Sequence, residues 1–583
     1  MLKFYDFEVF KYDWLTVIID PISQTETIAC NNPDQMKELL EKYKSNIWIG
    51  YNNTRYDQYI AKGIALDMDP KRINDFIIKE NHDGWQYSSL FNKIPMINYD
   101  VMLRNDTGLK SLEAFMGNNI KETSVPFDID RKLTDKEIQE TIGYCRNDVE
   151  QTIEVFLERK AEFDAALGLV KIFQLPLTYI GKTGAQRVAK ILGGKRLKFD
   201  DEFEFQLMPT LDLHKYKICA DWYKKPENHD YNKSHIIMIC GIPHTLAWGG
   251  LHGATGEIKY KKDGTIYIKS KPYYGEGVFL MADVTAYYPS LQLKYKLGYR
   301  NMGNPENFEK IHGENLRFKA AGDKKARLPY KIADNAISGQ LKDPNSSLFD
   351  PRENNAITVN GQLFLVDLIE HLEKGVPGIK LIQSNTDGIL LKLKSLDDYG
   401  LVDDIVYEWE CRTGMKMEFD IYSKVFQKDV NNYLLVAPNG KTKTKGGYTK
   451  GLSKVDYDLP IINKALIDFM VKGIPVETTI NNCNDLIMFQ KVVKLTGKYW
   501  AVWHNNKYIF DKCHRVFASL SQSDTYIGKC KREGATIEKF ANTPERCFII
   551  DDDIHNNIVP AKLNKQWYIS LANKRLTQYG VER

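Results

Sequence analysis

Two sets of acidic side chains stand out in this chain, because each set could hold a pair of divalent cations. The first set lies within residues 1–150 and consists of Asp6, Glu8, Asp57 and Asp148. The second set spans residues 283–387 and contributes Asp283 and Asp387. Two cations about 4 Å apart, held by carboxylates, can stabilise the attacking and the leaving oxygen of a phosphodiester. The sequence therefore predicts two separate centres that act on phosphodiesters.

In the first set, Asp6 and Glu8 lie in segment 4–10, which alternates as a β-strand does. Both carboxylates therefore leave the same face of the predicted strand. Two acids this close repel each other and raise each other's pKa unless a cation lies between them. Asp57 follows a second strand-like segment, 47–51. The two predicted strands would then bring Asp6, Glu8 and Asp57 close together.

The remaining acid of this set lies in a predicted helix over residues 133–148. Thr134 can cap that helix, and Glu137 occupies the capping-box position. Tyr144 and Asp148 are then one turn apart on the same face. Four acids would hold two metal ions, and Tyr144 would position the attacking water.

The second set is predicted to meet on a β-sheet. Residues 278–283 form an apolar run that ends in Asp283, which indicates a buried strand with a carboxylate at its tip. Segment 380–393 has two apolar arms around a glycine-containing turn, which predicts a hairpin with Asp387 at its bend. A carboxylate on that bend can face Asp283, although the two lie far apart in the sequence.

Between these acids, Lys331, Asn335 and Gly339 recur at every fourth residue and so share one helical face. Pro329 suits the first turn of such a helix. The lysine can contact a triphosphate, and Gly339 lets a base pair or backbone approach closely. Basic residues just upstream could add phosphate contacts or form a solvated helix face: Arg317, Lys319, Lys324, Lys325 and Arg327.

The first set, taken with its order along the chain, resembles the 3′–5′ exonuclease domain of DNA polymerases, of the four-acid type with a tyrosine (DEDDy). The resemblance implies an RNase H-like fold in which Asp6, Glu8, Asp57 and Asp148 bind metal, Tyr144 is catalytic and Asn53 contacts DNA. Asp100, between the second and third motifs, is interpreted as a structural aspartate.

The second set resembles the three motifs of family B DNA polymerases, of the bacteriophage type. Departures from the family pattern are Ala286, Tyr287, Ala336, Ser338 and Asn385. The resemblance implies that Asp283 and Asp387 are catalytic metal ligands. It also implies a nucleotide site of Val284, Tyr288, Lys331, Asn335 and Gly339. In that site Tyr288 lies beneath the sugar as a steric gate, and Lys331 contacts the phosphates.

Two further matches to the family are partial and concern DNA contacts. Gly249 and Gly250 keep the glycines of a Tyr-x-Gly-Gly motif, and Tyr433 keeps the tyrosine of a primer-binding Lys-x-Tyr motif. Three nearby lysines either replace the missing primer-binding charge or form a solvated hairpin: Lys441, Lys443 and Lys445.

The expected fold class is an α/β and α+β multidomain protein, with an RNase H-like exonuclease domain followed by a right-hand polymerase of palm, fingers and thumb. The expected boundaries are 1–165 for the exonuclease domain, 166–282 for a connecting region and the start of the palm, 283–300 for the palm with the first polymerase motif, 301–349 for the fingers, 350–440 for the palm with the third motif, and 441–583 for the thumb. The short spacing between the first two polymerase motifs lacks the insertion of protein-primed members. Nucleic-acid primers are therefore expected.

The composition narrows the class of protein but does not indicate a function. The net charge of +4 is weak evidence for a polyanionic partner, and no apolar run is long enough to span a membrane. None of the nine cysteines forms a Cys-x-x-Cys pair, which disfavours structural zinc and favours reduced thiols. The expectations are a cytoplasmic monomer (in the host cytoplasm if phage-encoded) that binds primer-template DNA, deoxynucleoside triphosphates and accessory replication proteins, with two Mg²⁺ per active site that Mn²⁺ could replace.

Three alternatives compete with this interpretation. A stand-alone exonuclease with a DNA-binding C-terminal region would have no use for buried, unpaired carboxylates at Asp283 and Asp387. A non-enzymatic replication scaffold would be expected to have lost at least one acid of the first set. The other major proofreading family is disfavoured by residues 287–290, Tyr-Tyr-Pro-Ser, and by the absence of a His-Asp-Glu turn.

Overall fold

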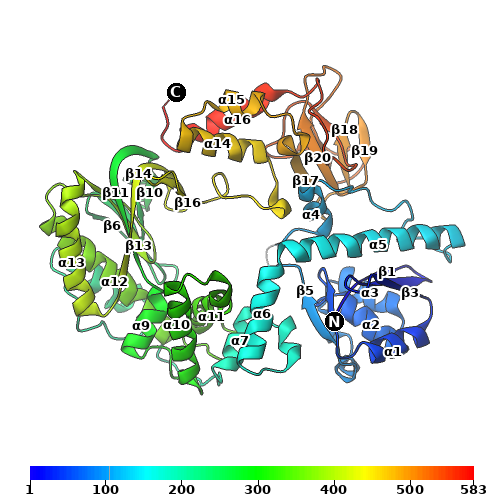
Figure 1. Cartoon of the computed structure of the whole chain (residues 1–583), viewed down its shortest axis with the longest axis horizontal. Helices are drawn as coiled ribbons and strands as arrows, with labels where there is room; N and C mark the ends of the chain where they lie inside the picture. Colours follow the sequence, from blue (N-terminus) through cyan, green and yellow to red (C-terminus); the bar gives the residue numbers. More distant parts are fainter. Residues whose placement is uncertain (104–105, 583) are drawn as a thin grey trace. The chain divides into compact units, whose positions relative to one another are not determined.

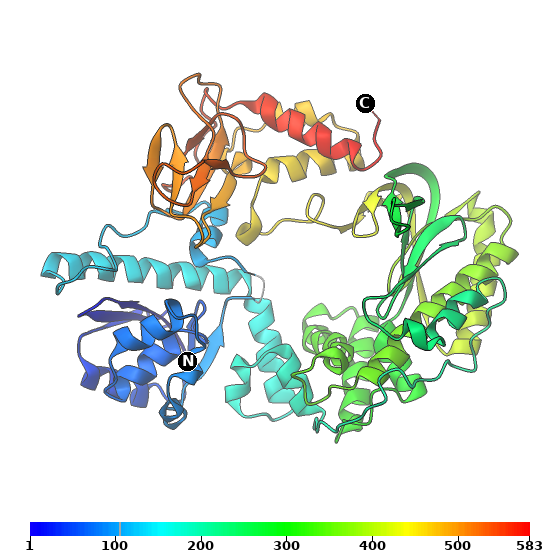
Figure 2. The ribbon, with the colours of Figure 1, turned by 180° about the vertical axis from the view of Figure 1, so that it is seen from behind.

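The computed structural model describes residues 1–103 and 106–582, and these divide into two compact units. Each unit is assembled from segments that are far apart in the sequence (Figures 1 and 2). The first consists of Met1–Thr183, Leu452–Pro460 and Asn484–Trp567. The second consists of Gly184–Gly451, Ile461–Cys483 and Tyr568–Arg583. Among the described residues, every helix is too short or too polar to traverse a lipid bilayer.

The first unit contains a five-stranded mixed sheet, in the order β3-β2-β1-β4-β5. Its strands are β1 (Leu2–Val9), β2 (Trp14–Asp20), β3 (Thr25–Cys30), β4 (Ile47–Gly50) and β5 (Ile97–Asp100). Alternate side chains of β1 enter different cores, with Phe4 in one core and Tyr5 and Phe7 in the other. The strand predicted around Asp6 and Glu8 is therefore confirmed, and both acids share the face of Phe4.

Helices cover both faces of this sheet. They are α1 (Pro33–Lys42), α2 (Asp57–Ala65), α3 (Pro70–Ile78), α4 (Leu109–Met116), α5 (Asp135–Glu158) and α6 (Lys160–Ile172). The predicted cap of α5 is confirmed. The Glu137 backbone N–H donates to the Thr134 hydroxyl at 3.3 Å, and the Thr134 N–H donates to the Glu137 carboxylate at 2.8 Å. These bonds satisfy two donors that a helix start leaves without partners.

The C-terminal part of the first unit, residues 484–567, is rich in β-structure and packs on α4. One sheet has the order β17-β20-β23 and the other β19-β18-β21-β22. The strands are β17 (Lys491–Lys494), β18 (Ala501–His504), β19 (Lys507–Ile509), β20 (Cys513–Ala518), β21 (Gly528–Cys530), β22 (Glu538–Lys539) and β23 (Cys547–Ile549). Ala114 and Ile120 share a small core with Val492 and Cys513. Segment 441–583 is thus divided between the two units, and its role as a thumb stays a prediction.

The second unit is built on a nine-stranded sheet, in the order β16-β15-β14-β11-β13-β12-β8-β7-β6. Its strands are β6 (His235–Ile239), β7 (Ile242–Leu246), β8 (His252–Ala254), β11 (Tyr273–Val284), β12 (Lys380–Ser384), β13 (Gly388–Leu393), β14 (Met417–Asp429), β15 (Asn432–Val436) and β16 (Thr442–Lys445). A separate hairpin joins β9 (Gly256–Tyr260) and β10 (Ile266–Ser270). The strand predicted to end at Asp283 and the hairpin predicted around Asp387 are both present, as β11 and as β12 with β13.

Helices of the second unit pack around this sheet or lie beside it. They are α7 (Gly184–Ile191), α8 (Lys217–Tyr223), α9 (Tyr287–Tyr295), α10 (Pro305–Ala320), α11 (Lys324–Lys342), α12 (Pro351–Gly375), α13 (Tyr399–Thr413), α14 (Pro460–Lys472) and α15 (Val476–Asn481). The last helix, α16 (Lys565–Thr577), begins in the first unit and continues in the second, because the boundary falls between Trp567 and Tyr568. The buried α12 supplies Val359, Leu363 and Phe364 to the main core.

Short 3₁₀ turns occur in both units. They occupy Gly84–Gln86, Ser89–Lys93, Leu177–Gly181, Pro226–Asn228, Leu396–Asp398, Lys454–Asp456 and Leu486–Phe489.

The prediction that Pro329 lies in the first turn of its helix is wrong. Helix α11 begins at Lys324, and the side chain of Asp323 caps it by accepting the Ala326 N–H at 2.9 Å. Pro329 lies inside the helix and is buried. An aspartate cap and tertiary burial therefore outweigh the one backbone hydrogen bond that an interior proline removes.

Candidate active sites

The first candidate site gathers the N-terminal acids at the end of β1. Phe7 donates its backbone N–H to the Asp57 carboxylate at 3.2 Å, which fixes the start of α2 against the strand. Ligand atoms of Asp6, Glu8 and Cys145 lie within 4.8 Å of one another. Glu8 is 7% exposed and Asp57 is 2% exposed. The acids of the first set are thus brought close together beside β1.

Electrostatics make this cluster unfavourable without a cation. Burial raises the pKa of Asp6 well above its usual range, and repulsion from Asp57, Glu8 and Asp148 raises it further. Burial and the charges of Asp148 and Asp57 raise the pKa of Glu8 in the same direction. The pKa of Asp57 is raised to about 8, mainly by burial. Oxygen-rich clusters of this kind fit Mg²⁺ or Mn²⁺, because hard divalent cations bind carboxylates and offset their repulsion.

Lys110 is a site residue that the sequence did not reveal. Its ammonium lies 2.9 Å from the Asp148 carboxylate and 3.0 Å from that of Glu113, and it is 4.8 Å from the centre of the Tyr144 ring. Burial opposes the charge of Lys110, but Asp148 and Glu113 outweigh it, so its pKa is raised and it stays a cation. The only sequence signal was its one-turn spacing from Glu113, which many surface pairs share.

Asp100 and Asn53 shape the turn that leads into α2. The Asp100 carboxylate accepts the Asn52 N–H at 2.8 Å, the Thr54 hydroxyl at 2.6 Å and the Met102 N–H at 3.0 Å. These bonds agree with its interpretation as a structural aspartate. Asn53 is 0% exposed. A contact between Asn53 and DNA would require this turn to open, and it stays a prediction.

The second candidate site lies on the sheet of the second unit. Strand β11 pairs with β13 so that Asp283 is opposite Gly388. The Val284 N–H donates to the Asp387 carbonyl at 2.7 Å, which holds the hairpin bend beside Asp283. A Cβ at position 388 would lie 2.7 Å from the Ala282 carbonyl and would meet the Asp283 carboxylate. Only glycine lets the two acid-bearing strands approach this closely.

Two more charged residues complete this centre. Lys443, from β16, forms an ion pair with Asp283. Asp420 lies on β14 opposite Met281, and its charge acts on Asp283. Burial raises the pKa of Asp283, the Lys443 ammonium opposes that rise, and Asp387 and Asp420 add to it. Lys443 therefore belongs to the acidic centre, whereas Lys441 and Lys445 are exposed.

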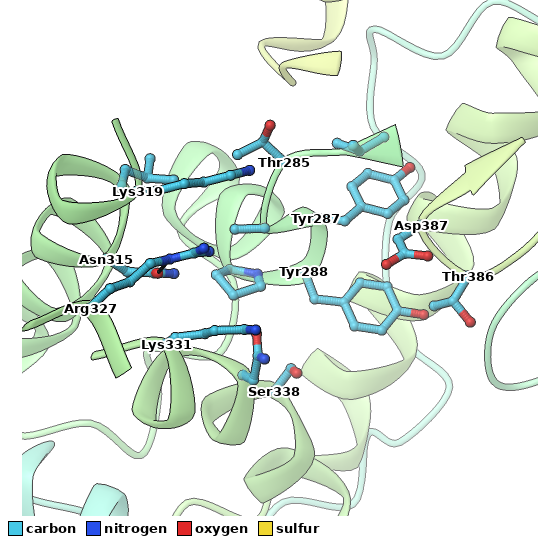
Figure 3. Close-up of a pocket in the computed structure, with 15 residues that line it drawn as sticks. Thr285, Tyr287, Tyr288, Asn315, Lys319, Arg327, Lys331, Ser338, Thr386 and Asp387 are labelled. Carbon is cyan, nitrogen blue, oxygen red and sulfur yellow. Dashed lines mark hydrogen bonds between the residues drawn. The ribbon is translucent and has the colours of Figure 1, made fainter. Parts of the chain in front are cut away.

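A cavity of about 280 Å³ opens beside this centre. Figure 3 shows Lys319, Arg327 and Lys331 on one side of it, and Tyr288 with Asp387 on the other. Val284, Asn335 and Ser338 also line the cavity. Residues 331, 335 and 339 are all exposed, which confirms their shared helical face, but Gly339 is not part of the lining. The cavity thus combines one acid, three cations and two aromatic rings.

The two adjacent tyrosines have different environments. Tyr287 is 4% exposed, and its hydroxyl donates to the Gly361 carbonyl at 2.7 Å, so it is anchored in the core. Tyr288 is half-buried and stacks on Tyr287 with ring centres 5.9 Å apart. Burial raises the pKa of Tyr288, so its phenol stays neutral. The more exposed ring therefore belongs to Tyr288, as its motif position implies.

The remaining predicted DNA contacts have mixed surroundings. Gly250 packs against Thr386, next to Asp387, because a Cβ there would lie 3.0 Å from the Thr386 Cβ. Nothing lies within 4 Å of a Cβ placed on Gly249. Tyr433 is 4% exposed and is part of the core beneath the sheet. DNA contacts by Gly249, Gly250 and Tyr433 stay predictions.

Comparisons with known proteins give little further guidance. No protein-family model and no curated protein matches this sequence. A solved structure, that of a family B DNA polymerase from the hyperthermophilic archaeon Pyrobaculum calidifontis, aligns with 100% of this chain and 78% of its own. The sequence identity is 13% and the TM-score is 0.44. Similarity at this level carries no argument about function, so the two sites must carry it.

Proposed function

We propose that this chain is a DNA-templated DNA polymerase of family B, with a 3′–5′ exonuclease in the same polypeptide. The observation that carries the proposal is the second site, where Asp283 and Asp387 meet beside a cavity lined by three cations and Tyr288. A deoxynucleoside triphosphate has complementary parts, since its phosphates suit the cations and its sugar suits a flat ring. The separate acidic cluster at β1 supports a second, hydrolytic activity.

In the polymerase site, Asp283 and Asp387 would hold two Mg²⁺, and Asp420 adds negative charge nearby. When bound, these ions would neutralise charge on the triphosphate and favour attack by the primer 3′ oxygen. Lys331 and Arg327 would bind the phosphates and orient the nucleotide. Lys443 forms an ion pair with Asp283, so its ammonium would have to leave that carboxylate for Asp283 to hold a cation.

In the exonuclease site, Asp6, Glu8, Asp57 and Asp148 would hold the cations. Lys110 positions Asp148 by their 2.9 Å ion pair. Burial and the neighbouring acids raise the pKa of Tyr144 strongly, so its phenol stays protonated. It would donate a hydrogen bond that orients the attacking water, and would not remove a proton from it.

Primer extension on a defined template tests both activities in one gel. With Mg²⁺ and nucleotides the primer should lengthen, and with Mg²⁺ alone its 3′ end should be trimmed. Mn²⁺ should substitute, and EDTA should stop both reactions. Trimming without extension under all conditions would favour a stand-alone exonuclease, and neither reaction would favour a non-enzymatic scaffold.

The finer assignments belong to the same proposal. The helical pair α10 and α11 bears the cations of the cavity, which supports its role as fingers. Replication of a phage genome from nucleic-acid primers, as a monomer in the host cytoplasm and with accessory proteins, rests on the resemblance of the motifs alone.

A further inference from the structure

The C-terminal β-rich part of the first unit carries exposed aromatic rings. Trp500 is 39% exposed and Phe510 is 61% exposed, and their ring centres are 5.2 Å apart. Tyr508 also contacts Trp500, with ring centres 5.1 Å apart. Large aromatic side chains that stay on the surface next to one another mark a binding surface more often than a core. Their π-faces suit stacking with bases.

Two lysines adjoin these rings. Lys512 follows Phe510 by two residues, and its carbonyl accepts the Leu495 N–H at 2.7 Å, which places it beside Lys494. Both lysines are exposed. Partial desolvation of the ammonium lowers the pKa of Lys494, Cys513 opposes that shift, and the nearby ammonium of Lys512 adds to it. The Lys494 ammonium lies 3.4 Å from the Thr107 hydroxyl, so its close contact is a neutral group. Two adjacent cations of this kind suit the phosphates of a nucleic acid.

The lysines lie close to the segment that carries Lys110, which contacts one of the exonuclease acids. Thr107 lies two residues before the start of α4, which carries Lys110. The Cys513 thiol, next to Lys512, lies 3.6 Å from the Lys110 carbonyl. The Lys110 ammonium in turn lies 2.9 Å from the Asp148 carboxylate. All of these residues belong to the first compact unit, so the path does not depend on how the two units are placed.

We propose that Trp500, Phe510, Lys494 and Lys512 form a guide for single-stranded DNA, which delivers a 3′ end to the exonuclease acids. Unpaired bases would stack on the two rings, and the phosphates that follow would contact the two lysines. A duplex fits this surface less well, because its bases are already stacked and do not present a free face. The guide rests on the proposed exonuclease function for its purpose, but binding to it can be measured without catalysis.

Binding is tested with fluorescence anisotropy of a labelled oligothymidylate of about 12 nucleotides, in EDTA to prevent cleavage. Replacing both rings (Trp500→Ala with Phe510→Ala) should raise Kd by about tenfold or more, since each stacked base contributes substantially. Trp85→Ala is the matched control, because Trp85 is 62% exposed in the same unit but outside the guide. Equal Kd values for the double variant and this control would overturn the proposal.

Charge is tested separately from stacking. Lys494→Glu with Lys512→Glu should weaken binding and reduce the dependence of log Kd on log salt by about 1.4, at about 0.7 for each single-strand phosphate. Lys42→Glu with Lys93→Glu makes the same change in net charge at two exposed positions elsewhere in the unit. An unchanged salt dependence in the first pair, or the same change in both pairs, would remove the lysines from the guide.

Hydrolysis then separates the guide from the exonuclease itself. In Mg²⁺, the ring variant should show a raised KM on the long oligonucleotide but an unchanged kcat on one of about three nucleotides, too short to reach the rings. Loss of activity on the short substrate as well would show that the rings serve the fold and not a guide. A wild-type protein that hydrolyses neither substrate would refute the proposed exonuclease, while the anisotropy result would still decide whether the surface binds single strands.

Discussion

At the scale of single residues, the ion pair between Lys443 and Asp283 assigns one lysine of the lysine-rich hairpin to the acidic centre. The sequence did not distinguish Lys443 from Lys441 and Lys445. The alternating pattern does not reveal which of the three lysines comes within reach of an acidic side chain. In the structure β16 is the edge strand, and Lys443 reaches Asp283. The pair balances a carboxylate that burial and neighbouring acids make costly to ionise.

Sugar selection depends on one ring. Tyr288→Ala should raise ribonucleotide incorporation by about one to several orders of magnitude, because it removes the group that would collide with a 2′-hydroxyl. Relative kcat/KM for ATP and dATP measures this effect. Tyr287→Ala should chiefly lower stability, since its ring and its hydrogen bond to Gly361 are buried. A large change in selectivity for Tyr287→Ala, with none for Tyr288→Ala, would mean that the motif has been assigned one residue out of register.

The buried acids predict how stability depends on pH when metal is absent. Burial raises the pKa of Asp57 to about 8, compared with about 3.9 for an unfolded chain. Between these values the folded state binds more protons than the unfolded state, so stability must fall as pH rises through this window. In EDTA, Tm should be lower at about pH 8.5 than at about pH 6, and Asp57→Asn should reduce the difference. A wild-type Tm that rises over this range would contradict the assigned burial.

At the scale of elements, local patterns predicted well and long-range packing did not. Strand β1, the cap of α5 and the hairpin around Asp387 depend on periodicity and turn chemistry within a few residues, and all three are confirmed. The contact of Lys110 with Asp148 depends on how α4 packs against α5. The place of Asp420 depends on the register of β14 with β11. Neither follows from local sequence.

The division of the C-terminal segment between the two units could not be predicted for the same reason, because it depends on long-range packing. Residues 484–567 pack on α4, because Val492 and Cys513 bury apolar surface against Ala114 and Ile120. No local pattern in segment 441–583 indicates this partner. The structure instead makes the first compact unit depend on residues far along the chain.

The junction between β20 and α4 can be tested through Arg515. This buried arginine donates from Nη2 to the Asp551 carbonyl at 3.3 Å and to the Asp552 carbonyl at 3.0 Å, and it also bonds the Asn118 carbonyl. Arg515→Met leaves these acceptors without a partner, so it should cost about 1–3 kcal/mol of stability. Exonuclease activity should fall while extension is retained. Urea unfolding and the trimming-to-extension ratio measure both effects, and equal losses of the two activities would contradict a local role.

At the scale of the whole molecule, the two proposed catalytic centres belong to different compact units. Their acids come from separate sheets, one with β1 at its centre and one with β11 and β13. Because the metal ligands are not shared, each activity should be removable without the other. This independence is the central claim of the account, since a single-activity enzyme would need only one of the two clusters.

The most direct test compares two variants in one primer-extension experiment. Asp387→Ala should lower extension by at least about 10³-fold, because it removes charge that is commonly worth several kcal/mol, and it should leave trimming of single strands intact. Asp6→Ala with Glu8→Ala should do the reverse, with circular dichroism confirming that both proteins are folded. Loss of both activities in either folded variant, or near-normal extension by Asp387→Ala, would contradict the assignment of two independent sites.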